Sequence, residues 1–367
     1  MTRLTFDDLE SLSLGAAVLG TGGGGDPYIG RLALRYQMEL RGEPSYIPAA
    51  DLADDAMVVT IGMAGSPAVA LEKLITLSFA DAPLRKIEKW FGRKADAVIP
   101  IEIGGMNSLL PLLTACATGL PVVDADGMGR AYPGGDKTTF WLAGISPYPM
   151  IMMNEHGETV ILEGVEGRPS EHIARAAMVE LGGAVSAATY VMTGRQAKDS
   201  AIHGTITLAI ELGRAIREAR REKLDPFEAI LGRLAATTPP TYGRMLFDGK
   251  VVDLTRNQEG GFNIGRGLLE ATDGSDDTMS FAFQNEYLYA RSGNEILALV
   301  PDLVCFLDRD TAEPITCESV RYGQRIKVIG IAGAPQFRSP AGLEVAGPGA
   351  FGLKETYVPI ETLANRR

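Results

Sequence analysis

Two patterns of apolar positions divide this chain. Up to about residue 165, short continuous apolar runs alternate with segments whose apolar residues recur every three or four positions. The first pattern favours buried strands and the second favours amphipathic helices. The strand-like runs span 57–63, 97–103 and 121–123. The helix-like segments span 5–18, 28–40, 69–79 and 107–118. Strands that alternate with helices in this way predict a mainly parallel sheet covered on both faces.

The second half begins with two amphipathic helices, predicted over 170–181 and 204–222. After about residue 243, short runs of Val, Ile, Phe and Tyr are separated by Gly, Pro, Asn and Asp. This pattern predicts a mainly β domain, built as a barrel or a sandwich. The stretch 330–351, rich in Gly, Pro and Ala, is expected to be a loop. We therefore expect an α/β domain over residues 1–168, followed over 169–367 by a helical connection and a mainly β domain.

The charge balance narrows the range of partners. Forty-six acidic residues against 35 basic ones leave a net charge of −11, which disfavours attraction to nucleic acid or to an anionic membrane. No apolar run reaches the roughly 18 residues that a membrane-spanning helix needs. Acidic residues stand where a signal peptide needs basic ones, and the three cysteines form no CxxC pair, which favours a reducing compartment. We expect a cytoplasmic protein that acts on a small molecule, and a homodimer or higher homo-oligomer is left open.

The first candidate for chemistry is a glycine-rich turn between the first two predicted helices. Residues 19–27 read Leu-Gly-Thr-Gly-Gly-Gly-Gly-Asp-Pro, with five glycines in six positions. Without side chains in the way, successive backbone N–H groups can converge on an anion in front of the next helix. The GK[ST] of a P-loop is missing, and a helix precedes the turn where a dinucleotide fingerprint needs a strand. The alternative to a binding role is a tight structural connection. The substrate-binding residues predicted here are Gly22, Gly23, Gly24, Gly25 and Asp26.

Acidic and amide side chains lie at the ends of the predicted strands. Glu102 lies in the second strand-like run and Asn107 follows it, whereas Asp124 and Asp126 follow the third, with Arg130 just beyond. Ligands of open α/β sheets bind beyond the carboxyl ends of the strands, so these groups and the glycine turn are expected to share one crevice. We predict Glu102, Asp124 and Asp126 as catalytic groups. Asn107 and Arg130 are predicted to bind substrate. For either aspartate, capping of the next turn is an equally good explanation.

A divalent metal at this crevice is left open. Aspartates two positions apart can ligate such a cation, and His203, just before the second long helix, could add a ligand. The chain has three histidines and neither an HxH nor an HExxH motif, which disfavours a histidine-rich zinc site. The metal-ligand candidates are therefore Asp124, Asp126 and His203.

Two further polar residues interrupt the apolar strands of the β half. Asn285 and Glu286 lie between Phe283 and Tyr287. They are predicted to bind polar atoms of the substrate. The competing explanation is an exposed strand end.

Several longer motifs carry a resemblance to a known family. They extend from about residue 7 to about residue 353 and read LGTGGGGDPYIG, EIGGMNSL, GLPVVDADGMGRAYP, FQNEYLYA, PDLVCFLD and GPGAFGL. In these motifs the chain resembles the bacterial S-methyl thiohydantoin desulfurase family, which is similar in context to hydantoinase and oxoprolinase systems. The resemblance implies a two-domain protein, α/β and then mostly β. It also implies a hydrolase that releases methanethiol from an S-methylated thiohydantoin and leaves a hydantoin.

The implied reaction assigns roles to the predicted groups. Water attacks the carbon of the C–S bond, Asp124 or Asp126 takes the proton from water, and the N–H groups of the glycine turn stabilise the developing charge. A bound metal could instead acidify the water, and Arg130 could hold a substrate carboxylate with two hydrogen bonds. Two alternatives stay open. One is an ATP-binding partner of a hydantoinase or oxoprolinase system, and the other is a non-catalytic partner subunit.

Overall fold

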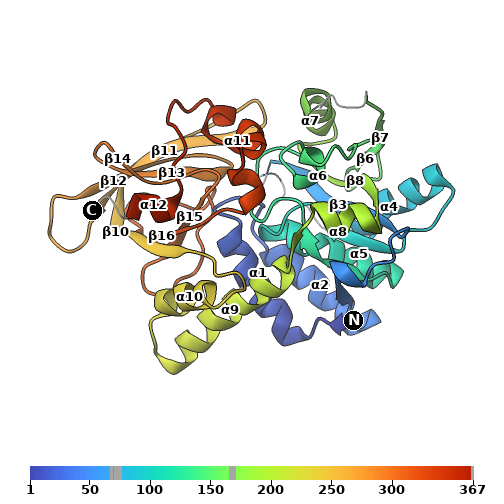
Figure 1. Cartoon of the computed structure of the whole chain (residues 1–367), viewed down its shortest axis with the longest axis horizontal. Helices are drawn as coiled ribbons and strands as arrows, with labels where there is room; N and C mark the ends of the chain where they lie inside the picture. The colour runs from blue at the N-terminus through green and yellow to red at the C-terminus, as the bar shows by residue number, and fades with distance from the viewer. Residues whose placement is uncertain (67–68, 70–76, 165–170, 365–367) are drawn as a thin grey trace.

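The first of two sheets contains nine strands, in the order β1-β2-β5-β4-β3-β8-β6-β7 with β9 paired to β5. The computed structural model describes residues 1–66, 69, 77–164 and 171–364 (Figure 1). Strands β2, β5, β4 and β3 run parallel, and the other strands add antiparallel pairs around them. The strands are β1 Thr2–Arg3, β2 Ser45–Pro48, β3 Met57–Gly65, β4 Ala97–Pro100, β5 Val122–Asp126, β6 Met150–Met153, β7 Thr159–Leu162, β8 Ala184–Thr193 and β9 Ile202–His203.

Both faces of the parallel strands are buried, as their continuous apolar runs predict. Along β3, Val58 belongs to a core shared with α6 and α8, whereas Val59 and Ile61 belong to the core shared with α1, α2, α4, α5 and α9. The helices of this half are α1 Phe6–Leu19, α2 Tyr28–Arg41, α4 Leu77–Phe91, α5 Leu110–Thr118, α6 Thr139–Leu142, α7 Glu171–Glu180, α8 Gly194–Ser200, α9 Thr205–Glu222 and α10 Pro226–Ala235, with 3-10 turns η1 Ala49–Asp51 and η2 Gly105–Ser108.

The predicted α/β architecture is confirmed, with shifts at two strand ends that matter for the site. Strand β4 stops at Pro100, so Glu102 lies beyond its carboxyl end, whereas β5 continues through Asp126 and includes both aspartates. The helix predicted over 69–79 lies mostly outside the described residues. The domain boundary between residues 168 and 169 stays a prediction. Strand β8, which comes after that boundary in the chain, lies between β3 and β6 in the first sheet.

The helix that leads into the glycine turn crosses α9 at very short range. Thr5 begins α1 with a capping box to Asp8, the arrangement that favours a helix start. A Cβ atom on Gly15 would lie 1.8 Å from the backbone oxygen of Ala209, and one on Gly213 would lie 1.8 Å from that of Ser11. Because only glycine leaves room for these backbones to touch, the crossing sets where α1 ends and the turn begins.

The second sheet is antiparallel throughout, with seven strands in the order β14-β13-β12-β11-β10-β16-β15. It curls so that β13 and β14 contact β15, and Phe281, Tyr287 and Phe306 pack inside the curl. The predicted mainly β domain is therefore confirmed as one half-closed sheet. The strands are β10 Gly243–Glu259, β11 Phe262–Ala271, β12 Thr278–Gln284, β13 Glu286–Ser292, β14 Glu295–Leu299, β15 Leu303–Asp308 and β16 Arg325–Ile331.

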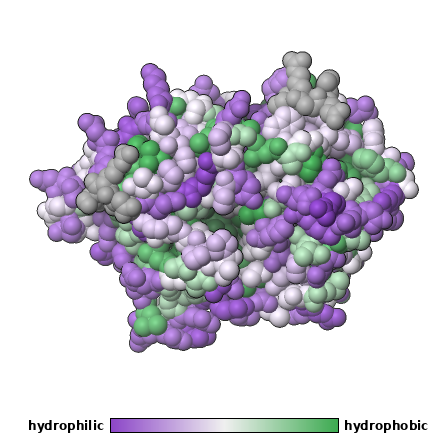
Figure 2. All heavy atoms as spheres, viewed as in Figure 1, coloured by the Kyte–Doolittle hydropathy of each residue, from purple (hydrophilic) through white to green (hydrophobic). Residues whose placement is uncertain are grey.

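The stretch 330–351 is more regular than the predicted loop. It contains η3 Pro335–Arg338, α11 Pro340–Ala346 and η4 Pro348–Phe351, and α12 Ile360–Ala364 follows. Ser339 caps α11 and Pro340 begins it, signals that the abundance of Gly and Pro obscured. On the face shown in Figure 2, hydrophilic side chains cover much of the surface and hydrophobic ones form separate patches. Among the helices of the described residues, none has the length and apolar character needed to cross a membrane.

Candidate functional site

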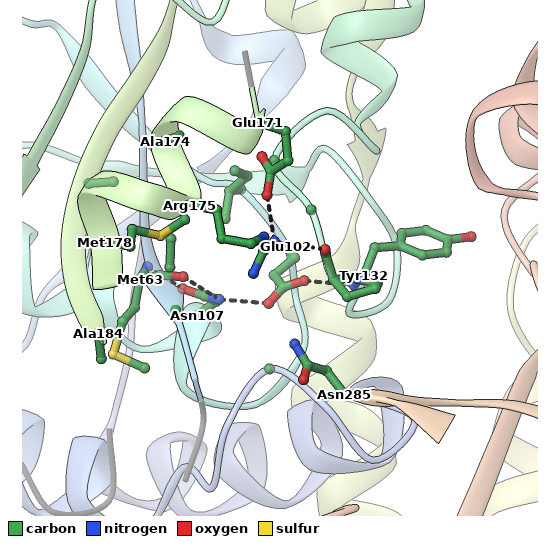
Figure 3. Close-up of a pocket in the computed structure, with 18 of the residues that line it drawn as sticks. Met63, Glu102, Asn107, Tyr132, Glu171, Ala174, Arg175, Met178, Ala184 and Asn285 are labelled. Atoms are coloured by element: carbon green, nitrogen blue, oxygen red, sulfur yellow. Dashed lines mark hydrogen bonds and ion pairs between the residues drawn. The ribbon is translucent and has the colours of Figure 1, made fainter. Parts of the chain in front are cut away.

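A pocket lies where the carboxyl ends of β3 and β4 meet the start of β13 (Figure 3). Gly24 and Gly25 of the glycine turn line it, together with the end of β3, the segment after β4, the loop after β5, one face of α7, and parts of β6 and β8. The residues Glu102, Asn107, Asn285 and Glu286, predicted from the sequence, all line this pocket. Its position beyond strand ends is the usual one for ligand sites in α/β sheets.

Glu102 is a buried carboxyl group held by two hydrogen bonds. It is 4% exposed. The side-chain amide of Asn107 donates to Oε1 at 2.6 Å, and the backbone N–H of Tyr132 donates to Oε2 at 3.0 Å. Burial raises the pKa of Glu102 to about 8, although both hydrogen bonds act to lower it. A carboxyl group whose pKa lies this close to neutral can serve as a general base or acid.

Asn107 fixes the geometry of Glu102 by binding the edge of β3. Its Oδ1 accepts the backbone N–H of Met63 at 2.5 Å, and its Nδ2 donates to the backbone oxygen of Met63 at 3.2 Å as well as to Glu102. With Oδ1 bound to an N–H group, Nδ2 must face the carboxylate. Asn107 is therefore a positioning residue for Glu102.

Glu286 is a second buried carboxyl group on the pocket wall. Its Oε2 atom is sealed from solvent and has no hydrogen-bond partner among the described residues. Burial, and then the charge of Glu102, raise its pKa well above the ordinary value. A buried carboxyl oxygen that lacks a donor favours the neutral, protonated form of its group. Glu286 is thus suited to give a proton, and Glu102 to take one.

Asn285 turns the chain into β13 and presents its amide to the pocket. Its φ angle of 63° is unusual for a residue other than glycine, and asparagine tolerates it better than most. Its Oδ1 accepts the backbone N–H of Asn263 at 2.8 Å, and its own N–H donates to the backbone oxygen of Asn263 at 2.8 Å. Figure 3 shows the amide reaching into the pocket opposite Glu102, where Nδ2 can donate to a ligand.

The glycine turn packs closely against other parts of the protein and also lines the pocket. A Cβ on Gly23 would lie 2.1 Å from Oε1 of Glu286, and one on Gly24 would lie 2.4 Å from the backbone oxygen of Gly104. The backbone N–H groups of Gly24 and Gly25 have no acceptor within the described parts of the chain. The turn therefore makes room for the Glu286 carboxyl and leaves donors beside the pocket.

Two other predicted members of the glycine turn face elsewhere. Gly22 packs against Tyr287 and Cys317, and its backbone oxygen accepts the Cys317 N–H at 2.9 Å. Asp26 is exposed and accepts the backbone N–H of Tyr28 at 2.8 Å, at the start of α2. Neither of them is among the residues that line the pocket, and neither is Gly23, which was also predicted to bind substrate.

Asp124 and Asp126 lie outside the pocket lining, and both carboxylates accept hydrogen bonds from the protein itself, whereas the buried Oδ1 of Asp126 has no partner among the described residues. Oδ1 of Asp124 accepts the N–H groups of Ile206 and Thr207 at 2.9 and 3.1 Å, which caps α9. Oδ2 of Asp126 accepts three N–H groups at 2.8 to 3.1 Å, those of Ile103, Met128 and Gly129. Both aspartates therefore bind nearby backbone N–H groups, as in the capping role that the sequence analysis gave as the alternative to catalysis.

Arg130 joins the two halves of the molecule and does not line the pocket. It is 1% exposed. Its Nη1 donates to the backbone oxygens of Pro301 and Asp302 at 3.1 and 3.0 Å, and its Nε to that of Ala131 at 3.0 Å. A substrate carboxylate would find these donors already engaged.

The metal-ligand candidates do not gather around a common point. His203 is exposed, and its Nε2 lies 2.9 Å from the backbone oxygen of Lys198. Within the described ranges, no group of three or more His, Cys, Asp or Glu side chains could hold a metal ion. Both oxygens of Asp124 and Oδ2 of Asp126 already accept hydrogen bonds, so these three oxygens are poorly placed to bind a cation.

The main contributor that sequence reasoning missed is α7. Arg175 and Glu171 on this helix line the pocket and pair at 2.5 Å. Arg175 Nη2 also donates to the backbone oxygen of Pro133 at 3.2 Å, and its guanidinium lies 3.9 Å from the centroid of the Phe262 ring. The helix was predicted, but an i, i+4 ion pair on a helix normally indicates a solvated face. Nothing local indicates that this face closes a pocket.

Comparison with known proteins agrees with this architecture. The family model "S-Me-THD-like, N-terminal domain" matches residues 7–164, and "S-Me-THD-like, C-terminal domain" matches residues 166–360. The chain is similar to an X-ray crystal structure of a protein from Chromobacterium violaceum, a structural genomics target, with a TM-score of 0.78 and 24% identity over 98% of this chain and 100% of that one. At that identity the likeness supports the fold alone. No curated protein matches the chain. Two matching models that together span nearly the whole chain show that it belongs to the S-methyl thiohydantoin desulfurase-like (S-Me-THD-like) family.

Proposed function

We propose that the protein is a hydrolase that releases methanethiol from an S-methyl thiohydantoin-like ring, with Glu102 and Glu286 as its acid–base pair. The observation that carries this proposal is the presence of two buried carboxyl groups in one pocket, Glu102 with a donor on each oxygen and Glu286 with an Oε2 that has no donor among the described residues. Two titratable groups whose environments separate their pKa values divide naturally into base and acid. Family membership supports the same reaction class.

The reaction needs one proton acceptor and one proton donor. The Glu102 carboxylate takes a proton from water as the water oxygen attacks the carbon that bears sulfur, and the Glu286 carboxylic acid gives a proton to the adjacent ring nitrogen. The C–S bond then breaks, its electron pair stays on sulfur, and sulfur takes the proton from Glu102. The hydroxyl of the adduct returns a proton to Glu286 as the carbonyl forms. The products are a hydantoin-like ring and methanethiol, and both carboxyl groups return to their starting states.

Three donors around the pocket can hold the ring during this reaction. The backbone N–H groups of Gly24 and Gly25 and the Asn285 amide lie on the pocket wall, and donors of this kind stabilise charge that develops on ring oxygen or nitrogen. Two of these donors belong to packed backbone, and the Asn285 side chain is held through its Oδ1 by the Asn263 N–H, so they need little reorganisation when the charge develops.

Arg175 takes the anchoring role that the sequence suggested for Arg130. The hydrogen bonds of its guanidinium to the described residues both involve Nη2, which leaves Nη1 and Nε available. Figure 3 shows the guanidinium pointing toward Glu102 at the centre of the pocket. A guanidinium so placed can bind a carboxylate on the ring substituent.

The test is release of methanethiol from an S-methyl thiohydantoin by the purified protein. Thiol is measured with a chromogenic reagent and hydantoin by chromatography, and equal amounts of the two products are expected. Arg175→Leu should raise KM more than it lowers kcat for a ring that carries a carboxylate, and should change little for one that does not. A folded wild-type protein that binds the ring without releasing thiol would instead favour the non-catalytic partner subunit.

A further inference from the structure

The pocket has a second wall of unusual composition, opposite the acid–base pair. Met63, Met150, Met152 and Met178 line it together with three alanines, Ala174, Ala184 and Ala187. Figure 3 shows Met63, Met178, Ala174 and Ala184 on one side, and Glu102, Tyr132 and Asn285 on the other. These seven residues are called the methionine wall below.

The methionine wall is apolar but has few stiff side chains. Ile101 is the single branched aliphatic residue among the described residues that line the pocket, whereas five of the chain's 13 methionines do so. Methionine is unbranched and polarisable and adapts its shape to what lies against it. Alanine adds little bulk, so α7, β6 and β8 present a shallow, deformable apolar surface.

Packing within the core explains only part of the methionine wall. Met152 and Met178 are 1% and 4% exposed, and they pack with Leu181 and Val185 between α7 and the sheet. Met63 and Met150, however, are only partly buried and line the pocket. A wall built for packing alone would normally use branched aliphatic side chains, which lose less entropy when they are ordered.

We infer that the methionine wall is the subsite for the alkylthio group of the substrate, and that it sets how long this group can be. The inference rests on the proposed function. The ring's nitrogen, oxygen and sulfur atoms face the carboxyl groups and amides, and the alkyl carbons on sulfur therefore lie against the apolar side. When the C–S bond breaks, a charged thiolate is poorly solvated there, so protonation of sulfur by Glu102 accompanies its departure. The neutral thiol then leaves along an apolar surface.

The experiment compares kcat/KM for S-methyl, S-ethyl and S-propyl forms of the same ring. Met178→Ala opens space in the wall, and each extra methylene that becomes buried there is worth about 4-fold. The ratio of kcat/KM for S-propyl over S-methyl is expected to rise about 10-fold or more relative to wild type. Met178→Leu, which keeps the volume, should leave the ratio within about 3-fold.

Met38→Ala is the matched control. Met38 is 2% exposed and belongs to the core beneath α2, so its truncation costs comparable stability at a site outside the pocket lining. It should leave the ratio unchanged. Met150→Ala, at a partly exposed position, makes the same test if Met178→Ala does not fold.

Each outcome is decisive. If wild type releases thiol but Met178→Ala and Met150→Ala both keep the wild-type ratio, the subsite is refuted while the proposed function stands. If wild type releases no thiol from any of the three compounds, the proposed function fails, and the subsite fails with it. A shift of the ratio in Met38→Ala as large as that in Met178→Ala would show a general loosening of the fold and would also refute the subsite.

Discussion

The neighbouring strands β4 and β5 both carry buried acids near their carboxyl ends, but the two sets of carboxyl groups have different surroundings. Asp126, on β5, is fully buried and its Oδ2 accepts three backbone N–H groups. Glu102, beyond β4, accepts one amide and one N–H group and lines the pocket. Burial raises the pKa of both, to about 7 for Asp126 and about 8 for Glu102. A raised pKa therefore does not separate a structural acid from a candidate catalytic one, whereas access to the pocket does.

The largest expected effect is on Glu102. Glu102→Gln keeps the size of the side chain but removes the proton acceptor, and loss of a general base lowers kcat by about 10³-fold. The melting temperature should fall modestly, because the new NH2 group must face one of the two donors that bind the Glu102 oxygens. Thiol release and thermal melting monitored by circular dichroism measure the two effects. A variant with more than about a tenth of wild-type turnover would remove Glu102 from the mechanism.

The pH profile should show the ionisation of the same group. Burial raises the pKa of Glu102 to about 8, and the base works only when it is ionised. Below pH 8, kcat/KM should therefore rise about tenfold per pH unit and level off above. The linkage to stability has the opposite sign. Because the folded-state pKa lies above the unfolded one, this group's contribution to the free energy of unfolding falls as pH rises from about 4.5 to about 8. A profile flat between pH 6 and 8 would contradict the assignment.

A smaller effect is expected when Glu286 is moved without being replaced. In Gly23→Ala the new methyl group would lie 2.1 Å from Oε1 of Glu286, so the carboxyl must shift, while the backbone angle of Gly23 suits alanine. Turnover should fall about tenfold, since a misplaced proton donor loses part of the 10²–10⁴-fold contribution of acid–base catalysis. Gly232→Ala is the control, because no atom lies within 4 Å of its new methyl group. Equal activity in the two variants would show that the turn does not position Glu286.

The smallest effect on turnover is expected at Asp124. Asp124→Ala removes the cap of α9 and should lower the free energy of unfolding by about 1–2 kcal/mol. Turnover per folded molecule should stay within about twofold, because Asp124 does not line the pocket. Chemical denaturation and thiol release test the two halves of this prediction. Lost turnover with unchanged stability would return Asp124 to the catalytic role that its place in the sequence suggested.

Several members of the candidate site could be found from sequence because their signals are local. Three features stand out without a structure. They are Glu102 near the end of the strand-like run 97–103, the glycine turn with Gly24 and Gly25, and the polar pair Asn285 and Glu286 between aromatic residues. All of them line the pocket. Arg175 could not be found in this way, because an ion pair at i, i+4 looks the same on a solvated helix and on one that closes a pocket.

By itself the sequence determined the two-part architecture, most element positions and the family, because periodicity, capping residues and long motifs are properties of neighbouring positions. The tertiary structure alone decided which acids are free to react. The donors that bind Asp124 lie 82 and 83 positions away along the chain, and the backbone oxygens that accept from Arg130 lie 171 and 172 positions away. It also brought α7, β3, β6 and β8 together as the methionine wall. Hydrogen-bond saturation and pocket shape depend on such distant partners, so no local pattern could have revealed them.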